Sequence, residues 1–218
     1  MCEWGYESGR GRAALERMNW VHSHYKIPND DYLYVLSTFI YEPIGWIDRF
    51  GWRPTCTTEK LGYYYFWREV GNRMGITGIP PSFEAFEAWS RSYEREQCRF
   101  ANTNQRIGAA TRELFASWFP GLVRPLVRYG IYAMLDNRML ASFGFPTPWP
   151  MTRALLGRAL KARGRVVRWL PPRRTPHFFT DNPNRTYRDG YRIEELGPPP
   201  LVAIEKARGK PTSPDDTA

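Results

Sequence analysis

The stretch MNWVHSHYKIPNDDYLYVLSTFIYEPIGWIDRF (Met18–Phe50) decides the fold class, because two helical patterns meet in it on either side of a proline. Before Pro28, apolar residues spaced three and four apart predict a helix over about 12–25. After it, the same spacing predicts a second helix over about 31–49. Pro28 separates the two helices, and the Asn-Asp-Asp sequence that follows it is expected to cap the second one.

Two of the three histidines in the chain lie two positions apart near the end of the first predicted helix. Residues at i and i+2 of a helix point about 200° apart, so His22 and His24 cannot bind one ligand from the same face. His22 shares an apolar stripe with Leu15 and Met18, and we expect it to point inward, with His24 toward the edge. A histidine on such a stripe is either a hydrogen-bonded core residue or a metal ligand, and periodicity alone leaves both readings open.

Helical spacing continues through most of the chain, and no alternation typical of β-strands interrupts it. Further helices are expected at about 57–75, 82–100, 105–118, 122–141 and 151–170. The fold class is therefore all-α, a single multi-helix bundle with a partly disordered C-terminal tail rich in Pro and Arg. We expect a disordered N-terminus over 1–11, a helical domain over 12–170 and an extended tail over 171–218.

The net charge of +9 is concentrated in one late segment, because eight basic residues and no acidic ones lie between positions 151 and 174. These residues are Arg153, Arg158, Lys161, Arg163, Arg165, Arg168, Arg173 and Arg174. Leucines, valines and Trp169 alternate with them, so the segment predicts an amphipathic helix. This helix either presents a solvated face or associates with an anionic membrane surface; no nucleic acid is expected.

Several common classes of site are excluded by the residues. The first 15 residues are charged and no run of about 18 apolar residues occurs, so neither a signal peptide nor a transmembrane segment is predicted. Phosphate loops, HExxH zinc helices and GxSxG elbows are absent, and Glu16 and His22 are too far apart for a di-iron Glu-x-x-His motif. A single imidazole in an apolar, aromatic helical bundle remains compatible with haem iron.

Five stretches together resemble one known family in their order and spacing. They are RMNWVHSHYKIPNDDYLYVLSTFIYEPIGWIDRFGWR, FWREVGNRMGI, IPPSFEAFEAW, WLPPRR and GYRIEELGP. The region from about Arg12 to Pro198 is similar to the ER-bound oxygenase mpaB and rubber oxygenase (latex clearing protein) family. The resemblance implies an all-α domain that binds one haem b through a single histidine, which corresponds to His22 here.

The resemblance also implies the reaction and its setting. Members of this family use dioxygen to cleave carbon–carbon double bonds in a prenyl or isoprenoid chain, and the mpaB branch acts at the endoplasmic reticulum membrane. The expected partners are therefore dioxygen and a small hydrophobic prenylated substrate. Family members also carry, before the histidine helix, a membrane anchor and helices with an arginine, a threonine and an acidic residue near the oxygen-binding side.

The present sequence has no positions that match these upstream residues, so no catalytic residue is assigned, and the chain is expected to be an N-terminally shortened member. Two functions stay open at this stage. One is a haem-dependent oxygenase with His22 as cofactor-binding and metal-ligating residue. The other is a non-catalytic, degenerate relative that acts as a structural or membrane-surface helical protein.

Overall fold

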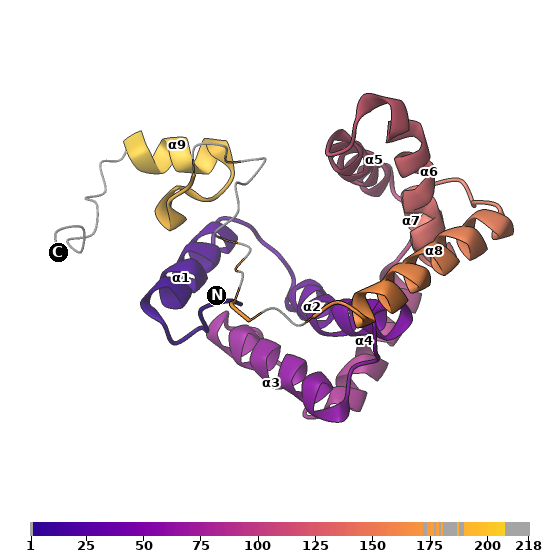
Figure 1. Cartoon of the computed structure of the whole chain (residues 1–218). Helices are drawn as coiled ribbons and strands as arrows, with labels where there is room; N and C mark the ends of the chain where they lie inside the picture. The colour runs from indigo at the N-terminus through magenta and orange to yellow at the C-terminus, as the bar shows by residue number, and fades with distance from the viewer. Residues whose placement is uncertain are drawn as a thin grey trace. The chain divides into compact units, whose positions relative to one another are not determined.

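The structure is a computed structural model in which every regular element of the described residues is helical (Figure 1). The described residues are 2–171, 174–176, 178, 180, 187 and 190–207. Among them lie α1 (Gly9–His22), α2 (Asn29–Phe50), α3 (Thr57–Arg73), α4 (Phe83–Gln97), α5 (Asn102–Ser117), η1 (Gly121–Val123), α6 (Arg124–Met134), α7 (Asn137–Phe143), α8 (Pro150–Arg168), η3 (Ile193–Glu195) and α9 (Pro199–Ala207). The predicted all-α fold class is confirmed.

The helix expected over 122–141 is wrong as a single element, because the structure divides it into η1, α6 and α7. Leu135 takes an extended conformation (φ −80°, ψ 145°) that ends α6. The side chain of Asp136 then accepts a 2.8 Å hydrogen bond from the backbone N–H of Met139 and begins a new helix. The apolar spacing runs through this break, which is why periodicity alone did not reveal it.

Both ends of the described chain hold helical turns outside the ranges expected to be helical. Residues 9–11, assigned above to a disordered N-terminus, form the first turn of α1. Within the tail, α9 forms over Pro199–Ala207, a segment that the sequence was expected to leave extended. Residues 208–218, where disorder is expected, lie outside the described residues.

Backbone contacts divide the chain into two compact units. Unit 1 comprises Met1–Leu33, Arg68–Gly78 and Pro172–Ala218, and unit 2 comprises Tyr34–Trp67 and Ile79–Pro171. Each unit buries its own apolar side chains. In unit 1 these are Leu15, Leu33, Val70 and Ile76; in unit 2 they include Leu36, Ile40, Ile44, Phe50, Tyr64, Phe86, Ala116, Tyr132 and Leu140.

In unit 2, a buried polar contact joins α2 to α4. The hydroxyl groups of Ser37 and Ser90 lie 2.8 Å apart, and Ser37 also donates to the carbonyl of Tyr34 at 2.6 Å. The Tyr34 hydroxyl donates to Glu94, while burial and the nearby carboxylate raise the pKa of that phenol. These bonds satisfy polar groups that would otherwise destabilise a helix interface when buried.

Helix α8 packs against the end of α2 through a glycine. Gly164 is buried, and a Cβ atom at this position would lie 2.7 Å from the Phe50 carbonyl oxygen and 2.9 Å from that of Gly51. Leu156 lies on the side of α8 that faces Gly130 of α6, with which α8 is in contact. Only glycine permits this close approach of helix and backbone.

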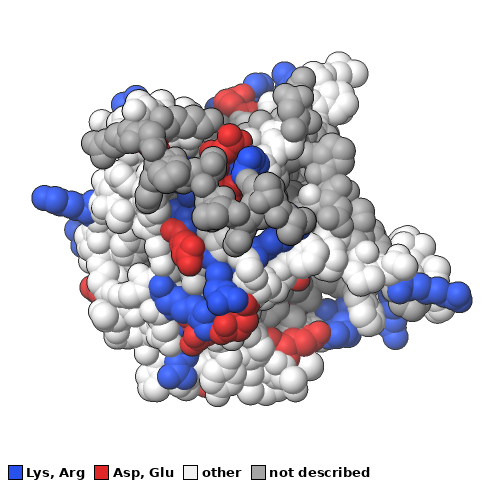
Figure 2. All heavy atoms as spheres, turned by 90° about the vertical axis from the view of Figure 1, so that its left-hand side faces the viewer, with Lys and Arg blue, Asp and Glu red and all other residues white. Residues whose placement is uncertain are grey.

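The face of the molecule drawn in Figure 2 carries charges of both signs. On the face drawn in Figure 2, lysines and arginines lie beside aspartates and glutamates, so positive and negative charge are interspersed there. None of the helices in the described part of the chain combines the length and apolar character needed to cross a bilayer.

Candidate functional site

Helix α1 carries the two sequence-predicted histidines, and its first turn is fixed by local hydrogen bonds. The Ser8 side chain accepts from the backbone N–H of Gly11 at 2.9 Å and donates to the Gly5 carbonyl at 3.0 Å. A Cβ atom on Gly11 would lie 1.8 Å from the Gly5 carbonyl oxygen, so this position requires glycine. The start of α1 is therefore set by backbone contacts and a side-chain cap.

His22 is the last residue of α1, and its imidazole is half-buried within unit 1. Its ring meets the ring of Tyr32 edge-on, with centroids 5.3 Å apart and an interplanar angle of 74°. The Nδ1 atom of His22 is buried and has no hydrogen-bond partner among the described residues. Burial lowers the pKa of His22 below its ordinary value, which favours the neutral ring.

His24 lies beyond the end of α1 and is exposed. Its Nδ1 atom is 2.8 Å from the Trp20 carbonyl oxygen, and its ring lies against the Trp20 ring at a centroid distance of 4.7 Å. The helix stops at His22, three residues before the predicted end at Tyr25, which is exposed. The two histidines thus differ in burial and in hydrogen bonding.

The expected cap of α2 by Asn29 is wrong. The Asn29 side chain instead forms a two-sided contact with Thr77, also in unit 1. Its Oδ1 accepts from the Thr77 backbone N–H at 2.9 Å, and its Nδ2 donates to the Thr77 carbonyl at 3.0 Å. The carbonyl of Pro28 accepts the first N–H groups of the helix, from Asp31 and Tyr32. Asn29 therefore holds the turn after α1 in place.

A second contact fixes α1 in its last turn. Asn19 donates to the Arg73 carbonyl at 3.0 Å, where α3 ends. The Arg73 guanidinium bonds to Glu69 at 2.8 Å and to Glu7, and it lies over the Tyr6 ring. Residues before α1 and at the end of α3 therefore hold the helix that carries His22.

Arg17 connects α1 to the tail, a contact that the sequence did not predict. Its Nε donates to the Leu196 carbonyl at 2.6 Å, and its Nη1 pairs with Glu205 at 2.7 Å. The guanidinium carbon lies 3.9 Å from the centre of the Trp20 ring. The Arg17 side chain is 9% exposed, and its Nη2 is buried with no hydrogen-bond partner among the described residues. Since the partners are more than 170 positions away, no local pattern could indicate them.

Within the described part of the chain, the candidate site consists of one histidine, His22, and not of a multi-residue metal cluster. Among the described residues, no group of three or more His, Cys, Asp or Glu side chains could hold a metal ion. A neutral imidazole with a buried, unpaired ring nitrogen is a group that can donate a lone pair to iron.

Comparison with known proteins gives relatives of this chain. The chain is 26% identical over 198 residues to the ER-bound oxygenase mpaB' of Penicillium brevicompactum, which covers 84% of this chain and 47% of that protein. It is 28% identical over 156 residues to the ER-bound oxygenase mpaB of Penicillium roqueforti, covering 64% of this chain and 52% of the relative. The chain thus spans about half the length of these relatives, and no solved structure matches it significantly.

The family assignment rests on a match that covers most of the chain. The sequence model of the family described as "ER-bound oxygenase mpaB/B'/Rubber oxygenase, catalytic domain" matches residues 2–169. This range includes α1 to α8 and His22. The two tail residues that contact Arg17, Leu196 and Glu205, lie outside the matched range. The chain belongs to the ER-bound oxygenase mpaB/B'/rubber oxygenase catalytic-domain family.

Proposed function

We propose that the protein is a haem-dependent oxygenase in which His22 binds the iron of a haem b. The observation that carries the proposal is the buried Nδ1 of His22, which has no hydrogen-bond partner among the described residues. A buried polar atom without a partner costs free energy, roughly 1–3 kcal/mol, and such atoms in native proteins often mark a ligand or ion. Membership of the oxygenase family makes iron the ligand to test first.

The residues of this chain would prepare the imidazole for such a role. Burial lowers the pKa of His22, so the ring keeps its lone pair at neutral pH. The edge contact with Tyr32 and the bond from Asn29 to Thr77 limit the movement of the turn that follows. When bound, haem would supply the iron that reacts with dioxygen.

We further propose that the reaction cleaves a carbon–carbon double bond in a small prenylated or isoprenoid substrate, using dioxygen. The support is membership of the oxygenase family together with an apolar and aromatic helical scaffold. No residue is assigned to orient dioxygen or to transfer a proton.

We also propose that the protein contacts the surface of the endoplasmic reticulum membrane, because its relatives are named ER-bound. Helix α8 supplies the cations for such a contact. Leu155, Val166 and Trp169 are exposed on it, whereas Leu156, Leu160 and Val167 are half-buried. Exposed apolar and basic side chains together are typical of helices that lie on anionic membranes.

The proposal is tested by reconstitution with haem. Purified full-length protein is titrated with hemin, and the Soret band and the far-ultraviolet circular dichroism are recorded for the wild type, His22→Ala and His24→Ala. We expect the wild type and His24→Ala to develop the band. His22→Ala should lose it and keep its helical content, because only the iron ligand is removed.

The same experiment distinguishes the alternative, a non-catalytic relative that packs this helix as ordinary core. A colourless wild type after titration with hemin would support that alternative. Loss of both helix and band in His22→Ala would assign His22 a structural role. Loss of the band in His24→Ala alone would move the ligand to His24.

A further inference from the structure

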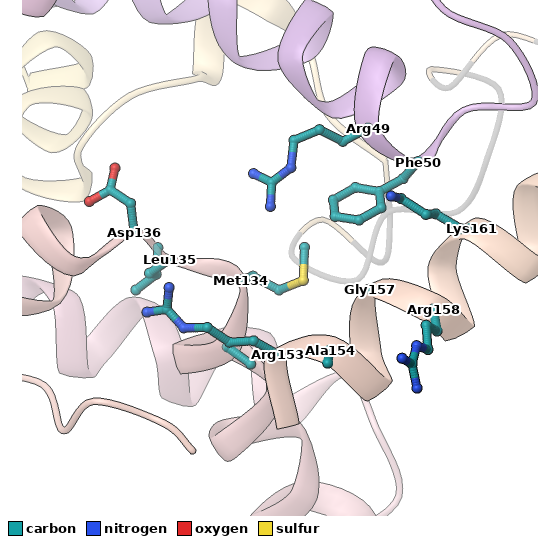
Figure 3. A pocket seen from close by; sticks show the side chains of 11 residues that line it. Arg49, Phe50, Met134, Leu135, Asp136, Arg153, Ala154, Gly157, Arg158 and Lys161 are labelled. Carbon is teal, nitrogen blue, oxygen red and sulfur yellow. The ribbon is translucent and has the colours of Figure 1, made fainter. Parts of the chain in front are cut away.

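A cavity of about 380 Å³ lies within unit 2, and the proposed oxygenase function does not use it. Its walls come from the last turn of α2, from the connection between α6 and α7, and from one face of α8 (Figure 3). The apolar part of the wall includes Phe50, Met134 and Leu135. Basic side chains form the rest.

The charges that line this cavity are unbalanced. Arg49, Arg153, Arg158 and Lys161 are basic, and Asp136 is the single carboxylate of the lining. One oxygen of that carboxylate already accepts the Met139 N–H at the start of α7. Four cations against one engaged carboxylate repel one another, and an anion in the cavity would relieve this repulsion.

Within the described part of the chain, three of these cations form no close ion pair, although Arg49 acts at longer range on the Glu42 carboxylate. Among the described residues, no carboxylate oxygen lies within 4.0 Å of the charged groups of Arg49, Arg158 or Lys161. Arg49 lies over the Phe50 ring at 4.9 Å, and Arg153 donates to the Asn137 side chain at 2.9 Å. Figure 3 shows the guanidinium groups of Arg49 and Arg153 turned into the space between the helices. The guanidinium groups of Arg49 and Arg153 therefore keep N–H donors that can bind a ligand.

The floor of the cavity has room for a bound group. Gly157 lies between Arg153 and Lys161 on the same face of α8, one turn from each. A Cβ atom on Gly157 would meet no heavy atom within 4 Å, so no packing contact in the protein requires glycine here. The absence of a side chain at Gly157 leaves space beside the guanidinium groups of Arg49 and Arg153.

We propose that this cavity binds a phosphorylated ligand through a phosphate monoester or diphosphate group. Guanidinium forks match the oxygen geometry of phosphate, and several cations favour a group with two or more negative charges over a single carboxylate. Phe50, Met134 and Leu135 would contact an apolar chain attached to it. Such a group is carried by soluble organic diphosphates and by the lipid phosphatidic acid.

The experiment uses inorganic pyrophosphate as the probe, titrated into the full chain by calorimetry at low ionic strength. We expect saturable binding by the wild type and a loss of affinity of about tenfold or more in Arg49→Ala and in Arg153→Ala. Gly157→Glu should abolish binding, because it adds a carboxylate to the open floor. Circular dichroism confirms that each variant is folded.

Two controls separate the cavity from the general charge of α8. Arg163→Ala and Arg165→Ala remove exposed cations from the same helix outside the lining and should leave pyrophosphate binding unchanged. Asn137→Ala removes the partner of Arg153 and keeps the cavity cation, so it should still bind. Equal losses in the cavity variants and the Arg163 and Arg165 variants would overturn the proposal, as would a wild type that binds no pyrophosphate.

Vesicles distinguish the two sources of the phosphate. Flotation with phosphatidic acid vesicles, compared with phosphatidylcholine vesicles, is measured for the wild type, Arg49→Ala and Arg163→Ala. Loss of flotation only in Arg49→Ala would identify a lipid headgroup as the ligand. If Arg49→Ala loses pyrophosphate binding but floats with the vesicles as the wild type does, the ligand is a soluble phosphate compound. This readout is independent of haem, so its failure leaves the oxygenase proposal unaffected.

Discussion

A single carboxylate joins the end of α2 to the segment that precedes α3. Asp48 accepts from the Thr55 N–H at 2.7 Å and from its hydroxyl at 2.6 Å, and it pairs with Lys60 at 3.0 Å. Hydrogen bonds from Thr55, with a further contribution from Lys60, lower the pKa of Asp48 to about 2. The ionised form is therefore the one that the fold prefers.

We expect Asp48→Asn to reduce the free energy of unfolding at pH 7 by roughly 1 kcal/mol, because the amide oxygen can still accept from Thr55 but the charge that strengthens those bonds and pairs with Lys60 is lost. The pKa of Asp48 is lower in the folded than in the unfolded protein. The contribution of this carboxylate to the free energy of unfolding is therefore complete above the ordinary pKa of 3.8 and is lost as the pH falls toward 2. The difference from wild type should therefore shrink between pH 4 and pH 2. Urea unfolding at several pH values measures it.

The matched control is Asp30→Asn, since the structure gives that exposed side chain no hydrogen bond to a described residue. It should change the free energy of unfolding by less than about 0.5 kcal/mol at each pH. A constant difference between Asp48→Asn and the wild type from pH 7 to pH 2 would contradict the assignment.

At the scale of the helices, α8 contains two glycines with opposite requirements. A Cβ on Gly164 would press on the Phe50 carbonyl, whereas a Cβ on Gly157 would meet nothing within 4 Å. We expect Gly164→Ala to lower the free energy of unfolding by about 1–3 kcal/mol through overpacking. Gly157→Ala should raise it by up to about 1 kcal/mol, because alanine favours the helix. Urea denaturation of both variants is the measurement; the same sign for both would refute this account of α8.

The sequence could predict elements better than the contacts between them. Apolar spacing predicted α1 to α5 and α8, because each buries one face and the pattern is local. The Asp136–Asn137 pair that starts α7 was a readable capping signal, but the continuous apolar period masked it. The position after Pro28 predicts a cap from Asn29 or Asp30, yet Asn29 bonds to Thr77, which lies 48 residues away. The cations of the cavity come from two helices distant in sequence, so no pattern could bring them together.

At the scale of the whole molecule, the tail stabilises the first helix. Arg17 and Glu205 form an ion pair at 2.7 Å, with side chains 9% and 23% exposed. We expect Glu205→Ala to lower the free energy of unfolding by roughly 1–3 kcal/mol, because it leaves a largely buried guanidinium without its carboxylate. Glu194→Ala is the control, since its pair with Arg192 is exposed and should contribute less than about 1 kcal/mol. Thermal and urea unfolding compare the two; an equal effect would argue against a structural role for the pair.

This contact also affects the order of events during protein synthesis. Arg17 is made early, whereas Leu196 follows it by 179 residues. At ~5–20 residues per second, roughly 10–40 s pass between the two on the ribosome. Throughout that interval α1 lacks the carbonyl and the carboxylate that hold its arginine, and all of the residues of unit 2 are joined before it ends. The helix that carries His22 therefore completes this set of partners only after the segment that contains Leu196 and Glu205 has been made.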